Sequence, residues 1–139
     1  MRKNIRIIIT DDQALYREIA KFILNNNENF EVVKICENGH DAVESVKLDC
    51  PDIMLVDINM KPMNGFDVTT QIKLLAPSVK IIAFTSHDEP AYVKHMFSLG
   101  ANGYITKTST IQEITKGIFE VYNGNDYICE EMKKNMTAQ

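Results

Sequence analysis

Polar side chains suited to chemistry stand at the ends of four apolar runs in this sequence. Asp57 follows the run Ile53–Val56, whose pattern predicts a strand buried on both faces of a parallel sheet. The other runs and the polar residues that end them are Ile5–Thr10 with Asp11 and Asp12, Val79–Phe84 with Thr85 and Ser86, and Gly103–Thr106 with Lys107. Because ligand crevices in open α/β sheets form at the carboxyl ends of strands, we expect these side chains to form one site.

A cluster of three carboxylates needs a counter-charge, because neighbouring carboxylates raise one another's pKa. A hard divalent cation such as Mg²⁺ supplies this charge and takes a few oxygen ligands plus waters. A lysine and a hydroxyl can hold the oxygens of a phosphoryl group during transfer. An aspartate can itself be the nucleophile and form an acyl phosphate. The residue types therefore indicate magnesium-dependent phosphoryl transfer onto a carboxylate.

Helical patterns occupy the segments between the strand-like runs. In each segment, apolar residues repeat at the spacing of one helical face, and turn or breaker residues end the pattern. The apolar sets lie within residues 15–23, 42–46, 68–75, 93–97 and 111–121. The chain therefore alternates strand and helix five times.

Short connections between alternating strands and helices favour parallel pairing with helices on both faces of the sheet. The second strand, Phe30–Cys36, includes the polar residues Glu31 and Lys34, so we place it at an edge. The first and third strands are more continuously apolar, which places them in the middle. These features predict a flavodoxin-like (βα)5 three-layer sandwich with five parallel strands in the order 2-1-3-4-5, whose crevice opens between strands one and three.

Length and composition are those of one ordinary globular domain. The chain has 139 residues, of which 45% are hydrophobic and 24% charged. Its net charge of -4 argues against nucleic-acid binding by this segment, because phosphate contacts need a basic face. Cys36, Cys50 and Cys129 match no ligand pattern and are expected to be reduced thiols. The absence of a membrane-length apolar stretch and of a signal peptide predicts a cytoplasmic protein without membrane contact.

Five polar residues at these strand ends, taken with their spacing, resemble the signature of the receiver domain of bacterial two-component response regulators. They are Asp11, Asp12, Asp57, Thr85 and Lys107. The resemblance implies that the phosphohistidine of a sensor histidine kinase donates its phosphoryl group to Asp57. It also implies that kinase specificity lies on the surface of the first helix, around Tyr16, Arg17 and Ala20.

The resemblance further implies a magnesium site. Asp12 and Asp57 would bind Mg²⁺ directly, together with the main-chain carbonyl of Asn59. Asp11 would contribute through a water molecule. The chain would act as a switch that is phosphorylated and dephosphorylated, rather than as an enzyme with an external substrate.

The switch residues follow from the same resemblance. Lys107 would pair with the phosphoryl group, and Thr85 would donate a hydrogen bond to it. Tyr104 matches the aromatic residue that turns inward when the threonine moves toward phosphate, which is a two-state element biased by a local charge change. Asn59 and His87, each two residues after a site residue, match positions that modulate hydrolysis of the acyl phosphate.

Two loops depart from the commonest receiver pattern. Thr108 follows Lys107 where many receivers have proline, and Pro62 stands one position later than is common. Neither change removes a ligating side chain. Both leave the geometry of these loops open, including any cis peptide bond at Lys107.

Residues 100–110 and 122–128 look like the NarL/FixJ-type subclass, in which a linker and a helix-turn-helix DNA-binding domain follow the receiver. We therefore expect residues 1–124 to form the receiver and residues 125–139 a tail or the start of a linker to an output domain that controls transcription. The spacing of Glu130 and Lys134 suits a helical linker. The alternative is a stand-alone receiver that acts as a relay or interaction module. A homodimer formed on phosphorylation could use the fourth and fifth helices or the first and fifth.

Three other functions compete with this interpretation. A phosphatase with an aspartate nucleophile generally needs a second aspartate two residues later as general acid, and here that residue is Asn59. A flavin- or nucleotide-binding module needs a phosphate-cradling loop after the first strand, where Asp11 and Asp12 would repel phosphate. A pseudo-receiver should have lost a site residue, and all five are present.

Overall fold

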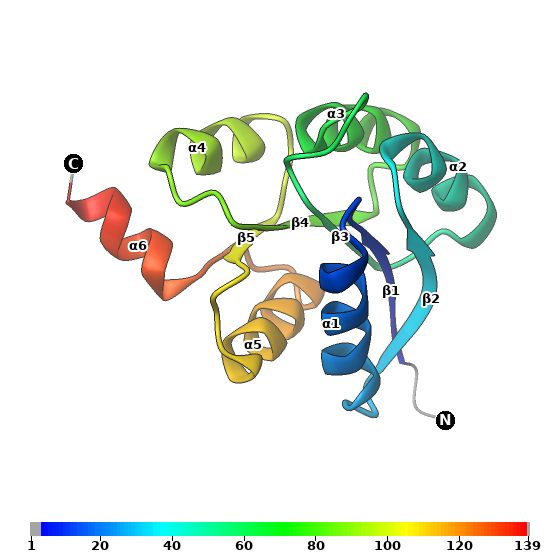
Figure 1. The fold of residues 1–139 in the computed structure, drawn as a ribbon, viewed down its shortest axis with the longest axis horizontal. Helices are drawn as coiled ribbons and strands as arrows, with labels where there is room; N and C mark the ends of the chain where they lie inside the picture. The colour runs from blue at the N-terminus through cyan, green and yellow to red at the C-terminus, as the bar shows by residue number, and fades with distance from the viewer. Residues whose placement is uncertain (1–3, 139) are drawn as a thin grey trace.

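The computed structural model describes residues 4–138 as a six-stranded parallel sheet with helices on both faces (Figure 1). The strand order is β2-β1-β3-β4-β5-β6, and each neighbouring pair is parallel. The strands are β1 (Ile5–Thr10), β2 (Phe30–Cys36), β3 (Ile53–Val56), β4 (Lys80–Thr85), β5 (Gly103–Thr106) and β6 (Tyr127–Ile128). The predicted flavodoxin-like parallel sheet and its order from β2 to β5 are confirmed.

Helices α1 and α5 cover one face of the sheet, and α2, α3 and α4 cover the other (Figure 1). The helices are α1 (Ala14–Asn25), α2 (Gly39–Asp49), α3 (Gly65–Leu75), α4 (Pro90–Ser98), α5 (Ile111–Tyr122) and α6 (Glu130–Thr137). The last of these, α6, packs against α4 and β5 at the end of the sheet. None of the helices within residues 4–138 has both the length and the apolar character that crossing a membrane requires.

The predicted count of five strands is wrong, because β6 pairs with the outer side of β5. Tyr127 N donates to Asn102 O at 3.0 Å, and Cys129 N donates to Tyr104 O at 3.0 Å. A two-residue strand is too short to show an alternating pattern in the sequence. The chain then turns into α6, whose Met132 is completely buried. The segment after residue 124 is therefore joined to the sheet by backbone hydrogen bonds and by buried side chains.

Asparagine and threonine side chains set the starts of the helices that lead away from the strand ends. Before α3, Asn64 Oδ1 accepts from Asp67 N at 3.0 Å, and Asp67 Oδ2 accepts from Asn64 N at 3.2 Å. Before α5, Thr110 Oγ1 accepts from Glu113 N at 3.1 Å. These bonds satisfy amide donors that an isolated first turn leaves free. They fix where each loop of the site gives way to a helix.

The core lies on both sides of β1, β3, β4 and β5, whose residues are almost all buried. The apolar stripe of α1 differs from the helical pattern in the sequence. Leu15, Ile19 and Phe22 are exposed, whereas Ala20 and Leu24 pack into the core. The sequence pattern thus located the helix correctly, but of its apolar set only Ile23 packs against the core.

Candidate functional site

The carboxyl ends of β1, β3, β4 and β5 lie side by side and bring the predicted residues together. Asp57 N donates to Thr10 O at 3.0 Å, which fixes Asp57 beside the end of β1. Lys107 N donates to Thr85 O at 2.9 Å, which fixes Lys107 beside the end of β4. The four strand ends inferred from the sequence therefore form one site.

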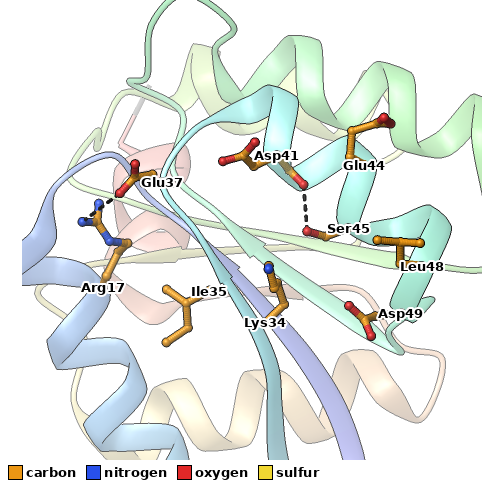
Figure 2. A pocket seen from close by; sticks show the side chains of 9 residues that line it. All are labelled: Arg17, Lys34, Ile35, Glu37, Asp41, Glu44, Ser45, Leu48 and Asp49. Carbon is orange, nitrogen blue, oxygen red and sulfur yellow. Dashed lines mark hydrogen bonds and ion pairs between the residues drawn. The ribbon is translucent and has the colours of Figure 1, made fainter.

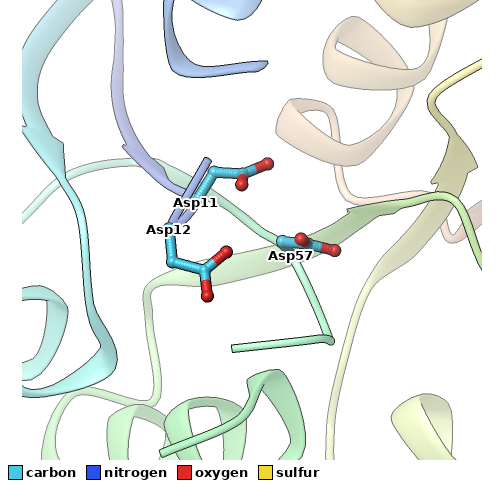
Figure 3. Close-up of side chains that lie close together, drawn as sticks. All are labelled: Asp11, Asp12 and Asp57. Carbon is cyan, nitrogen blue, oxygen red and sulfur yellow. The ribbon is translucent and has the colours of Figure 1, made fainter. Parts of the chain in front are cut away.

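Three carboxylates lie close together just after the ends of β1 and β3 (Figure 3). Asp11, Asp12 and Asp57 each offer a ligand oxygen, and these oxygens lie within 4.8 Å of one another. Asp11 and Asp57 are buried, while Asp12 is exposed. Burial raises the pKa of Asp11, and the charge of Asp57 adds to this effect. Such a donor set fits a hard divalent cation, because the ion removes the repulsion between the buried carboxylates.

Lys107 bridges the two buried carboxylates. Its Nζ lies 2.7 Å from Asp11 Oδ2 and 3.2 Å from Asp57 Oδ2, and only 4% of its side chain is exposed. The same ammonium lies 3.8 Å from the centroid of the Tyr16 ring. A buried cation between two carboxylates lowers the cost of burying their charges and keeps a positive charge next to Asp57.

A pocket of about 200 Å³ opens above Asp57. Its lining residues are Gln13, Tyr16, Asp57, Asn59, Thr85, Ser86, His87 and Lys107. The pocket brings together Asp57, Thr85 and Lys107 with both positions expected to modulate hydrolysis, Asn59 and His87. A molecule in this pocket would contact the Asp57 carboxylate, a hydroxyl and an ammonium at once.

A larger pocket of about 380 Å³ lies elsewhere, between α1 and α2 at the edge strand β2 (Figure 2). It carries charges of both signs, and Arg17 pairs with Glu37 across it at 3.6 Å. None of the residues predicted to act on phosphate lines it. The smaller pocket above Asp57 is therefore the candidate site.

Tyr104 lies behind the pocket rather than in its lining. The residue is completely buried, and burial raises the pKa of its hydroxyl. That hydroxyl donates to His87 O at 2.8 Å, and His87 N donates to Thr85 Oγ1 at 3.3 Å. A chain of two hydrogen bonds thus joins the threonine of the pocket to the buried tyrosine.

The structure defines the geometry of the two unusual loops. Lys61–Pro62 is the cis peptide bond within residues 4–138, and the bond after Lys107 is trans. Gly65 begins α3 against the end of β3, where an added Cβ would lie 2.6 Å from Asp57 O and 2.7 Å from Ile58 Cα. Because both contacts are with backbone, only glycine fits there, and α3 can start directly behind Asp57.

Two contacts at the site have no counterpart in the sequence analysis. Tyr16, expected on the kinase-facing surface, turns its ring onto Lys107, and Ala20 is buried. Glu131 of α6 accepts hydrogen bonds from the hydroxyls of Thr106 and Thr108 at 2.8 Å each. The position of Tyr16 in the first turn of the helix that follows Asp11 and Asp12 was a usable signal for the first contact. No pattern in the sequence indicates the second.

Comparisons with known proteins agree with this geometry. A family model described as the response regulator receiver domain matches residues 7–119. The transcriptional regulatory protein DegU of Brevibacillus brevis is 37% identical over 136 residues, which are 98% of this chain and 58% of DegU. The oxygen regulatory protein NreC of Staphylococcus epidermidis is 34% identical over 135 residues, which are 96% of this chain and 62% of NreC. The chain thus spans less than two thirds of the length of these curated relatives.

Solved structures give the same result for the fold. The signal receiver domain of the putative response regulator NarL from Mycobacterium tuberculosis has a TM-score of 0.85 and 30% identity, covering 88% of this chain and 99% of that one. A two-component response regulator of the LuxR family from Aurantimonas sp. SI85-9A1 has a TM-score of 0.93 at 24% identity, covering 98% of this chain and 97% of that one. The second match extends over almost the whole chain, which includes the region of β6 and α6.

Proposed function

Since this chain belongs to the response regulator receiver family, we propose that it accepts a phosphoryl group on the carboxylate of Asp57, with Mg²⁺ bound beside it. The observation that carries this proposal is the bridge that Lys107 makes between Asp11 and Asp57 at the floor of a pocket. That bridge places a positive charge where the oxygens of an incoming phosphoryl group would lie.

Asp57 is the acceptor because it alone of the three carboxylates lines the pocket with the two donors. Its oxygen attacks phosphorus, and a new oxygen–phosphorus bond forms as the bond to the leaving group of the phosphoryl donor breaks. The ammonium of Lys107 and the hydroxyl of Thr85 donate to the phosphoryl oxygens. The same groups lie beside the acyl phosphate when water later attacks it, and Asn59 and His87 set the access of that water.

Asp11, Asp12 and Asp57 would hold Mg²⁺, with the carbonyl of Asn59 as a further ligand. The gathering of their oxygens within 4.8 Å supports this assignment. Bound Mg²⁺ supplies positive charge that offsets the negative charge of the phosphoryl oxygens.

The hydrogen bonds through His87 support a switch. If Thr85 moves toward a phosphoryl group, the hydrogen bond that its hydroxyl accepts from His87 N would change. Because His87 O accepts a hydrogen bond from the hydroxyl of Tyr104, the change would also affect Tyr104. The signal would then reach β5 and the helices beside it. We infer a sensor histidine kinase as donor, a homodimer as the phosphorylated form, and transcription as the output, through a separate DNA-binding domain. The name of the relative DegU, a transcriptional regulatory protein, supports transcription as the output. A stand-alone relay is the alternative.

Asn59 favours a receiver over a hydrolase. A phosphatase with an aspartate nucleophile uses a carboxylic acid to protonate the leaving group. In this pocket the corresponding residue is Asn59, whose amide can donate hydrogen bonds but cannot act as a general acid. The acyl phosphate would therefore persist as a signal instead of being an intermediate of rapid turnover.

Incubation with acetyl phosphate and Mg²⁺ tests the proposed function. Intact-mass spectrometry should show one added phosphoryl group that hydroxylamine removes, as expected for an acyl phosphate. Chelation of Mg²⁺ with EDTA should prevent the addition. No added phosphoryl group at any Mg²⁺ concentration, or one that resists hydroxylamine, would contradict the proposal.

Asp12→Ala should remove about half of the stabilisation that Mg²⁺ gives. Ligand at about a hundred times its dissociation constant adds about 2.7 kcal/mol to the free energy of unfolding. A tenfold loss of affinity lowers that gain by about 1.4 kcal/mol. Asp12 is exposed, so without Mg²⁺ the variant should unfold like the unaltered protein.

Urea titrations with and without MgCl₂ measure this effect. The exposed Asp126→Ala serves as control, because it removes the same charge far from the pocket and should keep the full response to Mg²⁺. An Asp12→Ala protein that Mg²⁺ stabilises as strongly as the control would refute the assignment of Asp12 as a ligand.

A further inference from the structure

The ring of Tyr16 covers the ammonium group of Lys107. Lys107 Nζ lies 3.8 Å from the ring centroid, and the same nitrogen bonds to Asp11 and Asp57 on its other sides. Tyr16 itself is half-buried and forms part of the pocket wall. The lysine side chain is therefore enclosed by two carboxylates and one aromatic face.

The aromatic face of Tyr16 is an uncharged partner for Lys107. The ring attracts the cation through its quadrupole and accepts no proton from it, so the charge on the ammonium stays available to oxygens on the other side. The ring also excludes water from the ammonium, which strengthens the interaction of that charge with any anion in the pocket. A carboxylate in the position of the ring would have placed a third negative charge around the ammonium of Lys107, next to those of Asp11 and Asp57.

The start of α1 is fixed against the site, and this fixes the ring. Gln13 N donates to Asp11 Oδ1 at 2.9 Å, and Arg17 Nη1 donates to Asp11 O at 2.9 Å. Tyr16 lies between these two anchored residues on the first turn of the helix. These bonds hold the start of α1, which carries Tyr16, next to Asp11, whose carboxylate binds Lys107.

We propose that Tyr16 is a positioning residue for phosphoryl transfer. Its ring aims the ammonium of Lys107 at the phosphoryl group and closes one side of the pocket to water, so that it prolongs the life of the acyl phosphate on Asp57. This role rests on the proposed function and extends it to the regulation of the same site. It also separates Tyr16 from the exposed face of α1, which carries Leu15, Ile19 and Phe22.

Tyr16→Leu and Tyr16→Phe test this role together. Leucine fills much of the space but has no aromatic face, whereas phenylalanine keeps the face and loses only the hydroxyl. After removal of acetyl phosphate, the acyl phosphate on Tyr16→Leu should hydrolyse about three to ten times faster than on the unaltered protein, a range that follows from the strength of a partly desolvated cation–aromatic contact. Tyr16→Phe should stay within about twofold of the unaltered protein on the same grounds. Phe22→Leu removes an exposed ring from the same helix and should leave the rate unchanged.

The NMR signals of the Lys107 side chain report the contact independently of phosphorylation. The ring should shift the Lys107 methylene protons next to Nζ upfield, and Tyr16→Leu should abolish this shift while Tyr16→Phe keeps it. Loss of the shift without a faster hydrolysis in Tyr16→Leu would overturn the positioning role, and absence of the shift in the unaltered protein would overturn the contact itself. If the unaltered protein gains no phosphoryl group, the proposed function and the effect on lifetime both fail, whereas the shift still decides whether the contact exists.

Discussion

Asp57→Asn is expected to abolish phosphoryl uptake from acetyl phosphate. The amide has nearly the shape of the carboxylate but lacks the negatively charged oxygen that attacks phosphorus. Its oxygen can still accept a hydrogen bond from Lys107, so the pocket should keep its form. The fold should not suffer, because the substitution removes a buried charge that raises the pKa of Asp11. Intact-mass spectrometry should show the unmodified mass alone after an incubation that modifies the unaltered protein completely.

Asp126→Asn is the matched control for this experiment. It makes the same chemical change at an exposed position away from the pocket and should take up phosphate like the unaltered protein. Full uptake by Asp57→Asn would show that another residue accepts the phosphoryl group. In that case the stability of the product to acid, base and hydroxylamine would distinguish a second carboxylate from one of the histidines.

The strand ends of the site could be predicted because each follows a run of apolar residues. Ile5–Thr10 and Ile53–Val56 are buried on both faces, and such strands have few alternatives to the middle of a parallel sheet. Once their neighbours are known, the polar residues that follow them must meet at one edge. For this reason the sequence predicted that the side chains of Asp57 and Lys107 lie at the same edge of the sheet, although it did not give the distance between them.

Contacts that depend on how a helix lies on the sheet could not be predicted in the same way. The apolar pattern of α1 shows that a helix forms. The buried residues of this helix are Ala20 and Leu24, whereas larger apolar residues such as Phe22 face solvent. The direction of the Tyr16 ring depends on that placement. The family resemblance instead implied an outward position for Tyr16. The strand β6 could not be predicted either. It is held by backbone hydrogen bonds such as that from Cys129 N to Tyr104 O, and these groups are the same in almost every residue type.

Truncation of the chain after Gly124 is expected to lower the free energy of unfolding by about 4.5–9 kcal/mol, since a buried apolar side chain contributes about 1.5–3 kcal/mol and three are removed. The deletion removes Tyr127, Cys129 and Met132, which are all buried. It also removes the strand that pairs with β5 and the Glu131 carboxylate that holds the hydroxyls on both sides of Lys107. Because whole domains of this size are stable by only about 5–15 kcal/mol, the loss should be plain in a urea titration.

Met132→Ala tests the same packing without deleting any chain. It should cost about 2–5 kcal/mol, the usual range for truncating a buried methionine. Lys134→Ala, on the exposed side of α6, should change the free energy of unfolding by less than about 0.5 kcal/mol. If both the truncated protein and Met132→Ala unfold at the urea concentration of the unaltered protein, β6 and α6 add nothing to the core. If they unfold earlier as expected, residues 125–138 belong to the same cooperative unit as the sheet, and the hydrogen bonds from Thr106 and Thr108 to Glu131 connect α6 directly to the loop of Lys107.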